Sequence, residues 1–381
     1  MKVLILSCDT GEGHNSAAFA IYEHLKKINV ECEMLDALSL KSIKVSRMAR
    51  QAYLNVIKIP YLFGFIYNLG MLVSNSKIKS PVYYMNKSYR GKLHDYIKAN
   101  GFDTIITTHL FPAEALTALK RENRLSAHTI AVNTDYTCIP FWEETELDYY
   151  VISHKDLARE FIRRGIPKDK LLPFGIPVKA EFYVKLPKHE ARIMFCKLYN
   201  IDFDTSKPWY MIMSGSMGHG KIYRLVNAII KLHKTDVNII VICGTNKKLR
   251  NKLKTEYEDC KNVVLCGFCK DVPLIMDACD ILFTKPGGLS STEAAIKNIP
   301  IIHTAPIPGC ESKNARFFKK RYMSYSSRRI RNQLNAAIKI CSDETYRSKI
   351  IQAQKRSIPR DTCNNIYTLL TDLKRKEGMK P

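Results

Sequence analysis

Short apolar runs that end in glycine-rich or polar turns recur along the chain and predict parallel β-strands leading into helices. In the first half these runs cover residues 3–7, 104–109, 129–135 and 149–153. In the second half they cover residues 209–214, 238–244, 263–268, 281–284 and 299–303. Helical patterns lie between them, at residues 17–27, 113–120, 156–164 and 222–231. Such alternation is typical of α/β domains with a parallel sheet. The pattern therefore predicts two α/β halves, each opening with a strand, a glycine turn and a helix.

Proline and glycine punctuation marks the boundary between the halves. Gly165-Ile166-Pro167 stops a basic helix, and a second cluster of glycine and proline occupies residues 173–177. We therefore expect an N-terminal domain at 1–178 and a C-terminal domain at 179–350. Residues 351–381 are expected to form a helical tail that packs back on the N-terminal domain.

One turn of the second half combines two glycines with helix-capping side chains. Gly287 and Gly288 follow an apolar strand and let the backbone approach a ligand closely. Ser290 and Ser291 are residue types that favour a helix N-terminus, where free N–H groups and the helix dipole suit a phosphate. Glu293 follows where a carboxylate can accept a ribose hydroxyl. The segment is either a cradle for a nucleotide phosphate or an ordinary capped turn.

The glycine turn near the N-terminus carries a histidine. Gly11 and Gly13 precede His14, and Ser16 stands where the dinucleotide-binding fingerprint would have its third glycine. A histidine beside such a turn can act as a general base, or it can simply hydrogen-bond the turn. His109 and Asp135 end two further strands. Because ligands bind at the carboxyl ends of parallel strands, both are candidate acceptor-side residues.

Two short motifs are typical of metal sites, but neither has the context that a site requires. Cys266-Gly267-Phe268-Cys269 has no histidine at zinc-finger spacing, and Asp202-Phe203-Asp204 lies in a polar connector rather than after a strand. We therefore expect no metal and no cofactor.

The charge of the chain narrows the choice of partner. The chain has 381 residues, with 60 Lys and Arg against 36 Asp and Glu, which gives a formal net charge of +24. Such a field attracts nucleic acid, an anionic membrane or a polyphosphate substrate. We find no nucleic-acid-binding motif and expect no nucleic acid partner. A basic stretch follows residue 312, at Lys313, Arg316, Lys319, Lys320, Arg321, Arg328, Arg329 and Arg331. An anionic membrane is the favoured surface partner.

Residues 47–90 differ from the rest in character. They combine apolar and aromatic side chains, including Tyr61, Phe63, Phe65 and Tyr67, with basic flanks. This mixture suits a membrane interface, and a pair of core helices in an insertion is the alternative. No apolar run approaches 18 residues, so we expect no transmembrane helix. Twelve cysteines without a secretory signal indicate a reduced, cytoplasmic location.

Six segments, in order along the chain, resemble the diacylglycerol glycosyltransferases of the monogalactosyldiacylglycerol synthase family. The peptidoglycan N-acetylglucosaminyltransferase is a relative of that family. The segments are Asp9-Thr10-Gly11-Glu12-Gly13-His14-Asn15-Ser16-Ala17, Pro60-Tyr61-Leu62-Phe63-Gly64-Phe65-Ile66-Tyr67, Thr134-Asp135-Tyr136, Gly175-Ile176-Pro177-Val178, Lys285-Pro286-Gly287-Gly288-Leu289-Ser290-Ser291-Thr292-Glu293-Ala294 and Pro308-Gly309-Cys310-Glu311-Ser312-Lys313-Asn314-Ala315. The resemblance implies the GT-B fold, in which two Rossmann-like domains face each other across a cleft.

The resemblance also implies roles for individual residues. His14 would be the base, with Asp135 as the second candidate, and Glu293 would bind the ribose. Phe268 and Cys269 would frame the uracil, and Glu311 and Asn314 would contact the sugar. The complete set implied for UDP-sugar binding is Gly13, Lys179, Ser214, Gly215, Ser216, Phe268, Cys269, Gly287, Gly288, Leu289, Ser290, Ser291, Glu293, Glu311 and Asn314. Tyr61, Phe63, Phe65, Tyr67 and His109 would face the membrane or the acceptor.

The function implied is a membrane-associated, inverting glycosyltransferase. It would move a hexose from a UDP-sugar to the 3-hydroxyl of diacylglycerol or of glycosyl-diacylglycerol, on the inner face of the cell membrane. Glucose is the favoured hexose and galactose the alternative, with repeated addition as an option. Three rival functions stay open. They are an N-acetylglucosamine transferase acting on a peptidoglycan lipid intermediate, a non-catalytic UDP-sugar-sensing membrane protein, and a sugar-nucleotide 2-epimerase.

Overall fold

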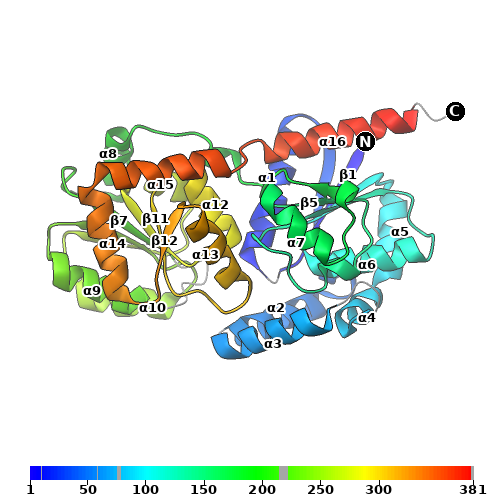
Figure 1. Cartoon of the computed structure of the whole chain (residues 1–381), viewed down its shortest axis with the longest axis horizontal. Helices are drawn as coiled ribbons and strands as arrows, with labels where there is room; N and C mark the ends of the chain where they lie inside the picture. The colour runs from blue at the N-terminus through cyan, green and yellow to red at the C-terminus, as the bar shows by residue number, and fades with distance from the viewer. Residues whose placement is uncertain (10, 58, 75–78, 214–221, 379–381) are drawn as a thin grey trace. The chain divides into compact units, whose positions relative to one another are not determined.

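The computed structural model divides the chain into two compact units. It describes residues 1–9, 11–57, 59–74, 79–213 and 222–378. The N-terminal unit comprises Met1–Ala180, Pro308–Cys310 and Pro359–Pro381. The C-terminal unit comprises Glu181–Ile307 and Glu311–Ile358. The chain thus crosses between the units more than once, and its last helix belongs to the first unit (Figure 1).

The N-terminal unit is built on a six-stranded parallel sheet with the strand order β2-β1-β3-β4-β5-β6. Because β1 lies between β2 and β3, the strand order reverses direction at the β1–β3 pair. This is the place where ligands bind in open α/β sheets. The strands are β1 (Lys2–Ser7), β2 (Glu31–Asp36), β3 (Thr104–Thr107), β4 (His128–Val132), β5 (Tyr149–Val151) and β6 (Leu171–Leu172). The helices are α1 (Glu12–Lys27), α2 (Ile43–Ile57), α3 (Pro60–Val73), α4 (Pro81–Lys87), α5 (Arg90–Asn100), α6 (Leu110–Arg121), α7 (Ala158–Arg163) and α16 (Thr362–Gly378).

The C-terminal helix α16 completes the core of the N-terminal unit. Ile366 and Leu370 of α16 are buried in the same apolar cluster as Val3 and Ile5 of β1 and Ile21 of α1. Period-two strands and a period-3.6 helix each present one apolar face, and the core forms where these faces meet. Residues 359–378 are therefore an integral part of this unit.

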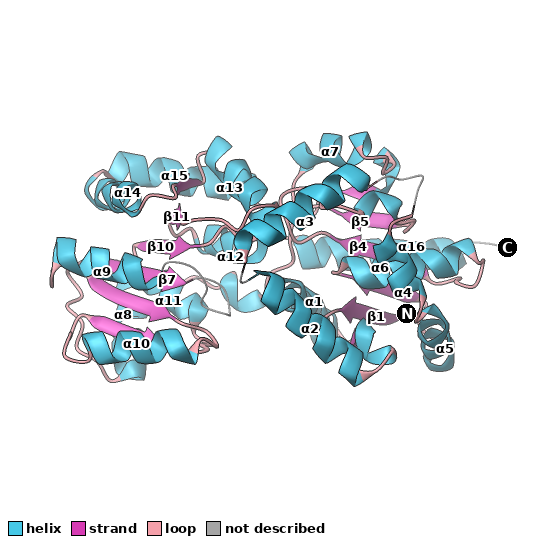
Figure 2. Ribbon diagram, turned by 90° about the horizontal axis from the view of Figure 1, so that it is seen from below, coloured by secondary structure: helices cyan, strands magenta, loops and turns pink. Residues whose placement is uncertain are grey.

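The C-terminal unit repeats the plan, with a six-stranded parallel sheet in the order β12-β11-β10-β7-β8-β9. Helices cover both faces of the sheet, with α9, α10 and α14 on the face that carries the main apolar cluster (Figure 2). The strands are β7 (Trp209–Met213), β8 (Asn238–Ile242), β9 (Val263–Cys266), β10 (Ile281–Thr284), β11 (Ile301–His303) and β12 (Ser324–Ser326). The helices are α8 (Lys188–Tyr199), α9 (Ile222–His233), α10 (Lys247–Tyr257), α11 (Val272–Ala278), α12 (Gly288–Lys297), α13 (Cys310–Lys320), α14 (Ile330–Ser342) and α15 (Glu344–Ser357).

The apolar pattern located most of both sheets, including the edge strand β9, but missed the edge strands β2, β6 and β12. The edge strands β2 and β12 have polar sequences, Glu-Cys-Glu-Met-Leu-Asp and Ser-Tyr-Ser, because an edge strand needs fewer apolar contacts. Helix α1 also begins earlier than expected, at Glu12 rather than Ala17, so Gly13 and His14 lie within its first turn. Because the helix begins before His14, the helical backbone sets the direction of the His14 side chain.

Helix α3 lies against the N-terminal unit through its small residues. A Cβ atom added at Gly70 would lie 3.3 Å from Pro140 Cβ, which is tighter than most Cβ contacts, so glycine allows this close approach without a shift of the neighbouring proline. The C-terminal end of α3 is fixed by polar contacts, because Ser74 Oγ donates to Glu143 at 2.6 Å and Arg164 donates to Ser74 at 3.2 Å. Within the described ranges, no helix has both the length and the apolar content that crossing a bilayer requires.

Candidate active site

His14 lies near the β1–β3 pair, where the strand order of the N-terminal sheet reverses. Both its ring and its backbone carbonyl make hydrogen bonds there. Its Nδ1 atom lies 2.8 Å from the Thr108 carbonyl oxygen and 2.9 Å from Thr134 Oγ1. The Thr108 hydroxyl also donates to the His14 carbonyl at 3.0 Å. Thr108 follows β3 and Thr134 follows β4, so the ends of adjacent strands position the imidazole.

These contacts fix the tautomer of His14. A backbone carbonyl can only accept a hydrogen bond, so Nδ1 of the neutral ring must carry the proton. The lone pair of the neutral ring is then on Nε2. This is the arrangement that a general base needs, with one nitrogen anchored and the other able to take a proton.

The surroundings of His14 favour its neutral form. Burial lowers the pKa of His14 below the ordinary 6.5, while the charge of Asp135 and the hydrogen bond to Thr108 act in the opposite direction. A lowered pKa keeps the imidazole unprotonated near neutral pH, so His14 is ready to accept a proton without first losing one.

His109 and Asp135, both expected at the acceptor side, lie beside His14. The rings of His14 and His109 meet edge to face, with centroids 4.8 Å apart. Burial holds the pKa of His109 well below its usual range, and repulsion from His14, when that ring is protonated, acts in the same direction. His109 Nδ1 accepts from the Phe111 N–H at 3.1 Å and so caps α6. The Asp135 carbonyl accepts from Ser153 Oγ at 2.7 Å, which fixes the loop that carries its carboxylate.

In the C-terminal unit, the Gly287–Gly288 turn joins β10 to α12 as expected. The N-cap residue Gly287 has φ −68° and ψ 141°, and no side chain among the described residues caps the helix. A Cβ atom added at Gly287 would meet no atom of the described residues within 4 Å, so these residues leave the space in front of the turn open. The first N–H groups of a helix have no partner within the helix, and they can therefore bind an anion placed in this space.

The two serines of α12 point in different directions. Ser290 and Glu293 are partly exposed, whereas Leu289 is buried and Ser291 is fully buried. Ser291 Oγ lies 3.0 Å from Nε2 of His303, the last residue of β11. Ser290 and Glu293 are thus accessible to a ligand, whereas Ser291 packs beneath the turn against His303.

Glu311 and Asn314, both expected to contact the sugar, are tied to the same turn. Lys285 Nζ lies 3.2 Å from Glu311 Oε1, and the Ile307 N–H donates to Glu311 Oε2 at 2.7 Å. Asn314 is buried and donates to the Pro286 carbonyl at 3.1 Å. These contacts join α13 to the segment between β10 and α12.

The remaining residues of the expected donor set lie apart from this turn or outside the described residues. Phe268 is 68% exposed, and Cys269 Sγ lies 3.2 Å from the Tyr199 hydroxyl. Lys179 is in the N-terminal unit, where its Nζ lies 4.9 Å from the centroid of the Phe19 ring. Ser214, Gly215 and Ser216 fall outside the described residues.

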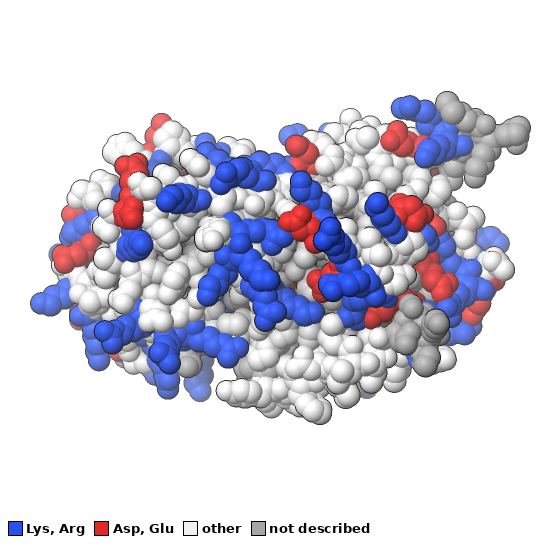
Figure 3. Space-filling model, viewed as in Figure 1, with Lys and Arg blue, Asp and Glu red and all other residues white. Residues whose placement is uncertain are grey.

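The outward face of α3 is apolar, although it meets solvent. Tyr61 is 88% exposed, Phe65 66% and Leu72 83%, while Tyr67 is buried and Phe63 is partly buried. Helix α3 has no charged residue, and the surface over it in Figure 3 is free of blue and red. An exposed patch of this kind is the mark of an interaction site.

Basic side chains gather elsewhere on the molecule. On the C-terminal unit they cover α13, which exposes Arg316, Lys319 and Lys320 (Figure 3). On the N-terminal unit, Lys44 and Arg47 of α2 are exposed next in the chain to α3. Each unit therefore presents basic surface to solvent.

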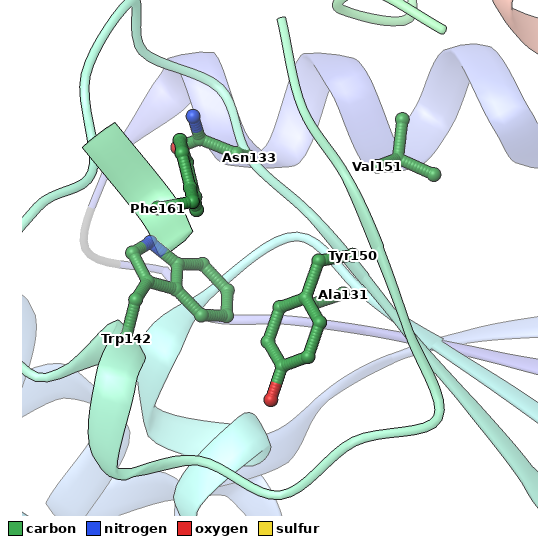
Figure 4. Close-up of a pocket in the computed structure, with 6 residues that line it drawn as sticks. All are labelled: Ala131, Asn133, Trp142, Tyr150, Val151 and Phe161. Carbon is green, nitrogen blue, oxygen red and sulfur yellow. The ribbon is translucent and has the colours of Figure 1, made fainter. Parts of the chain in front are cut away.

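A small apolar pocket lies beneath β4 and β5 in the N-terminal unit (Figure 4). It has no room for a water molecule and is lined by Ala131, Asn133, Trp142, Tyr150, Val151 and Phe161. All six residues are buried. The pocket is a packing gap in the core and does not contact His14.

Four residues of these sites were missed by sequence reasoning. Thr108 and Thr134 contact His14, Lys285 pairs with Glu311, and His303 contacts Ser291. Each lies at or just after the end of a parallel strand. That position was the available signal, because polar residues at carboxyl strand ends meet at one edge of a sheet.

The fold, together with the candidate sites at the strand ends of each sheet, defines the structural class of this protein. Two Rossmann-like units in one chain are the GT-B arrangement, and solved structures agree. The chain matches MnaA of S. aureus in its UDP co-structure with a TM-score of 0.64 at 13% identity, covering 100% of this chain and 99% of that one. It matches MurG of Acinetobacter baumannii with a TM-score of 0.60 at 11% identity, covering 97% and 99%. The expected GT-B fold class is confirmed.

Sequence comparison then narrows the class to a family. A profile described as monogalactosyldiacylglycerol (MGDG) synthase matches residues 14–178. The chain is 26% identical, over 98% of its length and 92% of the other's, to a protein named processive diacylglycerol beta-glucosyltransferase from Staphylococcus haemolyticus. A Bacillus subtilis protein of the same name is 26% identical over 90% of this chain and 87% of that one. The resemblance to the diacylglycerol glycosyltransferase family is confirmed.

Proposed function

We propose that this protein is a UDP-sugar-dependent hexosyltransferase that transfers a hexose, glucose by preference, to the 3-hydroxyl of diacylglycerol. The observation that carries the proposal is the similarity along nearly the whole chain to proteins named processive diacylglycerol beta-glucosyltransferase. The likeness to MurG and MnaA supports the fold alone, because both are under 25% identical to this chain.

In this proposal the N-terminal unit activates the acceptor. His14 Nε2 takes the proton from the lipid hydroxyl, and the oxygen attacks the anomeric carbon from the face opposite the leaving group. The new glycosidic bond forms as the bond to the UDP oxygen breaks, which inverts the configuration. The Thr108 carbonyl holds Nδ1–H and stabilises the imidazolium that forms.

The C-terminal unit holds the donor. The N–H groups at the start of α12 receive the diphosphate, and the helix dipole stabilises the charge that develops on the leaving UDP. Ser290 binds a phosphate oxygen and Glu293 binds the ribose, since both side chains open to solvent beside the turn. Lys285 adds a cation next to the turn and is balanced by Glu311 until the donor arrives.

We further propose that the protein docks on an anionic membrane at the inner face of the cell membrane. Tyr61, Phe65 and Leu72 of α3 would enter the interface, which offers their exposed apolar surface a better environment than water. Basic residues of α2, which precedes α3 in the chain, would face anionic headgroups. Tyr67 is buried and would support the helix from within.

The first experiment measures UDP release. UDP-glucose, UDP-galactose and UDP-N-acetylglucosamine are each supplied with and without diacylglycerol in anionic vesicles. We expect release that requires both UDP-glucose and diacylglycerol. Release that requires UDP-N-acetylglucosamine and a peptidoglycan lipid intermediate would overturn the proposal, and so would conversion of the sugar nucleotide without any acceptor.

The donor cradle has a direct test at Gly287. Its φ of −68° is allowed for any residue and no described residue fills the space in front, so Gly287→Ala should fold normally. The added methyl group occupies the place proposed for the diphosphate, and we expect UDP affinity to fall at least about tenfold. Gly91→Ala is the matched control, because a Cβ atom there also meets nothing within 4 Å. Equal UDP affinities of the two variants would contradict this placement of the diphosphate.

A further inference from the structure

A buried histidine lies beneath the phosphate-binding turn of the C-terminal unit. His303 ends β11 and has no exposed surface. Its Nε2 lies 3.0 Å from Ser291 Oγ in the first turn of α12, and its Nδ1 lies 3.0 Å from Ser324 Oγ of β12. The imidazole therefore links two strands to the start of one helix.

His303 is neutral in this position. Burial lowers the pKa of His303 to about 3. A neutral imidazole donates from one nitrogen and accepts at the other, so one serine hydroxyl must accept and the other must donate. Both ring nitrogens are then satisfied, and the Phe318 ring packs against the imidazole with centroids 5.4 Å apart.

The polar link is a costly way to fill a core position. A leucine would bury its surface without removing polar groups from water, whereas each buried hydroxyl or imidazole must recover its lost hydrogen bonds. The hydrogen bond between His303 and Ser291 instead fixes the orientation of the first turn of α12. Ser291 lies one residue after Ser290, so fixing Ser291 Oγ sets the rotation of the turn that presents Ser290 and the free N–H groups.

We infer that His303 is a positioning residue for the donor diphosphate, acting through Ser291 on the first turn of α12. The inference rests on the proposed UDP-sugar site in this unit. It predicts that the contact with Ser291 matters for phosphate binding and that the contact with Ser324 matters only for folding.

Two substitutions separate these contacts. The amide of glutamine reaches about as far as Nε2, and the shorter amide of asparagine reaches about as far as Nδ1. His303→Gln should therefore keep the hydrogen bond to Ser291, and His303→Asn should keep the bond to Ser324. Ser291→Ala and Ser324→Ala remove the same two contacts from the other side, with smaller changes in the core.

The assay compares UDP with uridine, which lacks phosphate. For His303→Asn and Ser291→Ala we expect UDP affinity to fall about fivefold, the worth of about one hydrogen bond, while uridine affinity is unchanged. For His303→Gln and Ser324→Ala we expect wild-type affinity for both ligands. Thermal unfolding of all four variants shows how much folding stability each one loses.

Three results would overturn the inference. One is an equal loss of UDP and uridine affinity in Ser291→Ala, which would show a general effect on the unit. Another is a larger loss of UDP affinity in Ser324→Ala than in Ser291→Ala. The third, wild-type protein that binds no UDP, would overturn the proposed donor site together with this inference.

Discussion

The apolar face of α3 permits a prediction about membrane binding. The double variant Phe65→Ala and Leu72→Ala should bind anionic vesicles more weakly than the wild type. Both side chains are largely exposed, at 66% and 83%, so their truncation should leave the free energy of unfolding nearly unchanged. The variant therefore separates lipid binding from folding.

The expected loss follows from the exposed fractions. Complete burial of a leucine or phenylalanine side chain is worth about 1.5–3 kcal/mol. Scaling the lower value by the exposed fractions gives about 1 kcal/mol for each side chain and about 2 kcal/mol for both. The vesicle partition coefficient should then fall about 30-fold.

Vesicle flotation or sedimentation measures the partition coefficient, with vesicles of phosphatidylglycerol and diacylglycerol. Leu198→Ala with Leu232→Ala is the matched control, because these residues of α8 and α9 are also exposed, at 58% and 50%. Added salt should weaken the binding of every variant through the basic residues, without removing the difference between α3 and the control. Equal partition coefficients for the two double variants would refute the assignment of α3 to the membrane.

Three further predictions concern the base, a buried ion pair and the C-terminal helix. His14→Ala should keep UDP affinity but lose about 10²- to 10⁴-fold in turnover. The wild-type kcat/KM should fall on the acid side with an apparent pKa below 6.5, and Asp135→Asn should move this limb to lower pH, because it removes the charge that raises the His14 pKa. Loss of all activity in Asp135→Asn, with full activity in His14→Ala, would make Asp135 the base. Lys297→Ala should lower the free energy of unfolding by about 3–5 kcal/mol in urea titrations, because Asp277 then stays buried without its cation, 2.6 Å away in the wild type. Leu370→Ala, at a 1% exposed position of α16, should lower it by about 2–5 kcal/mol, and an unchanged urea midpoint would contradict the role of α16 in the core.

Much of the fold could be predicted because strands and helices depend on neighbours a few residues away. The run Ile281–Thr284 and the turn at Gly287 lie where the apolar pattern and the glycines placed them. The edge strands β2 and β12 escaped the same reasoning, because they carry polar residues and are specified by pairing with β1 and β11.

The candidate sites were predictable in part. The position of His14 after the first strand made it a candidate base, but its partners Thr108 and Thr134 lie 94 and 120 residues away. No local pattern records that β1, β3 and β4 lie side by side. The two serines of α12 were also predictable only in part. The sequence shows that both are residue types common at a helix N-terminus. Only the packing of the helix on β11 turns Ser291 inward and leaves Ser290 facing outward.

The sequence by itself determined the alternation of strand and helix, the glycine turns, the positive charge and the apolar character of the segment that forms α3. These depend on residue type and on spacings within a few turns of the chain. The tertiary structure alone decided which nitrogen of His14 carries the proton, that His303 lies beneath the Gly287–Gly288 turn, and that Tyr67 turns inward while Phe65 faces solvent. The physical reason is that each of these depends on atoms brought together by the order of the strands or by the packing of a helix on its sheet.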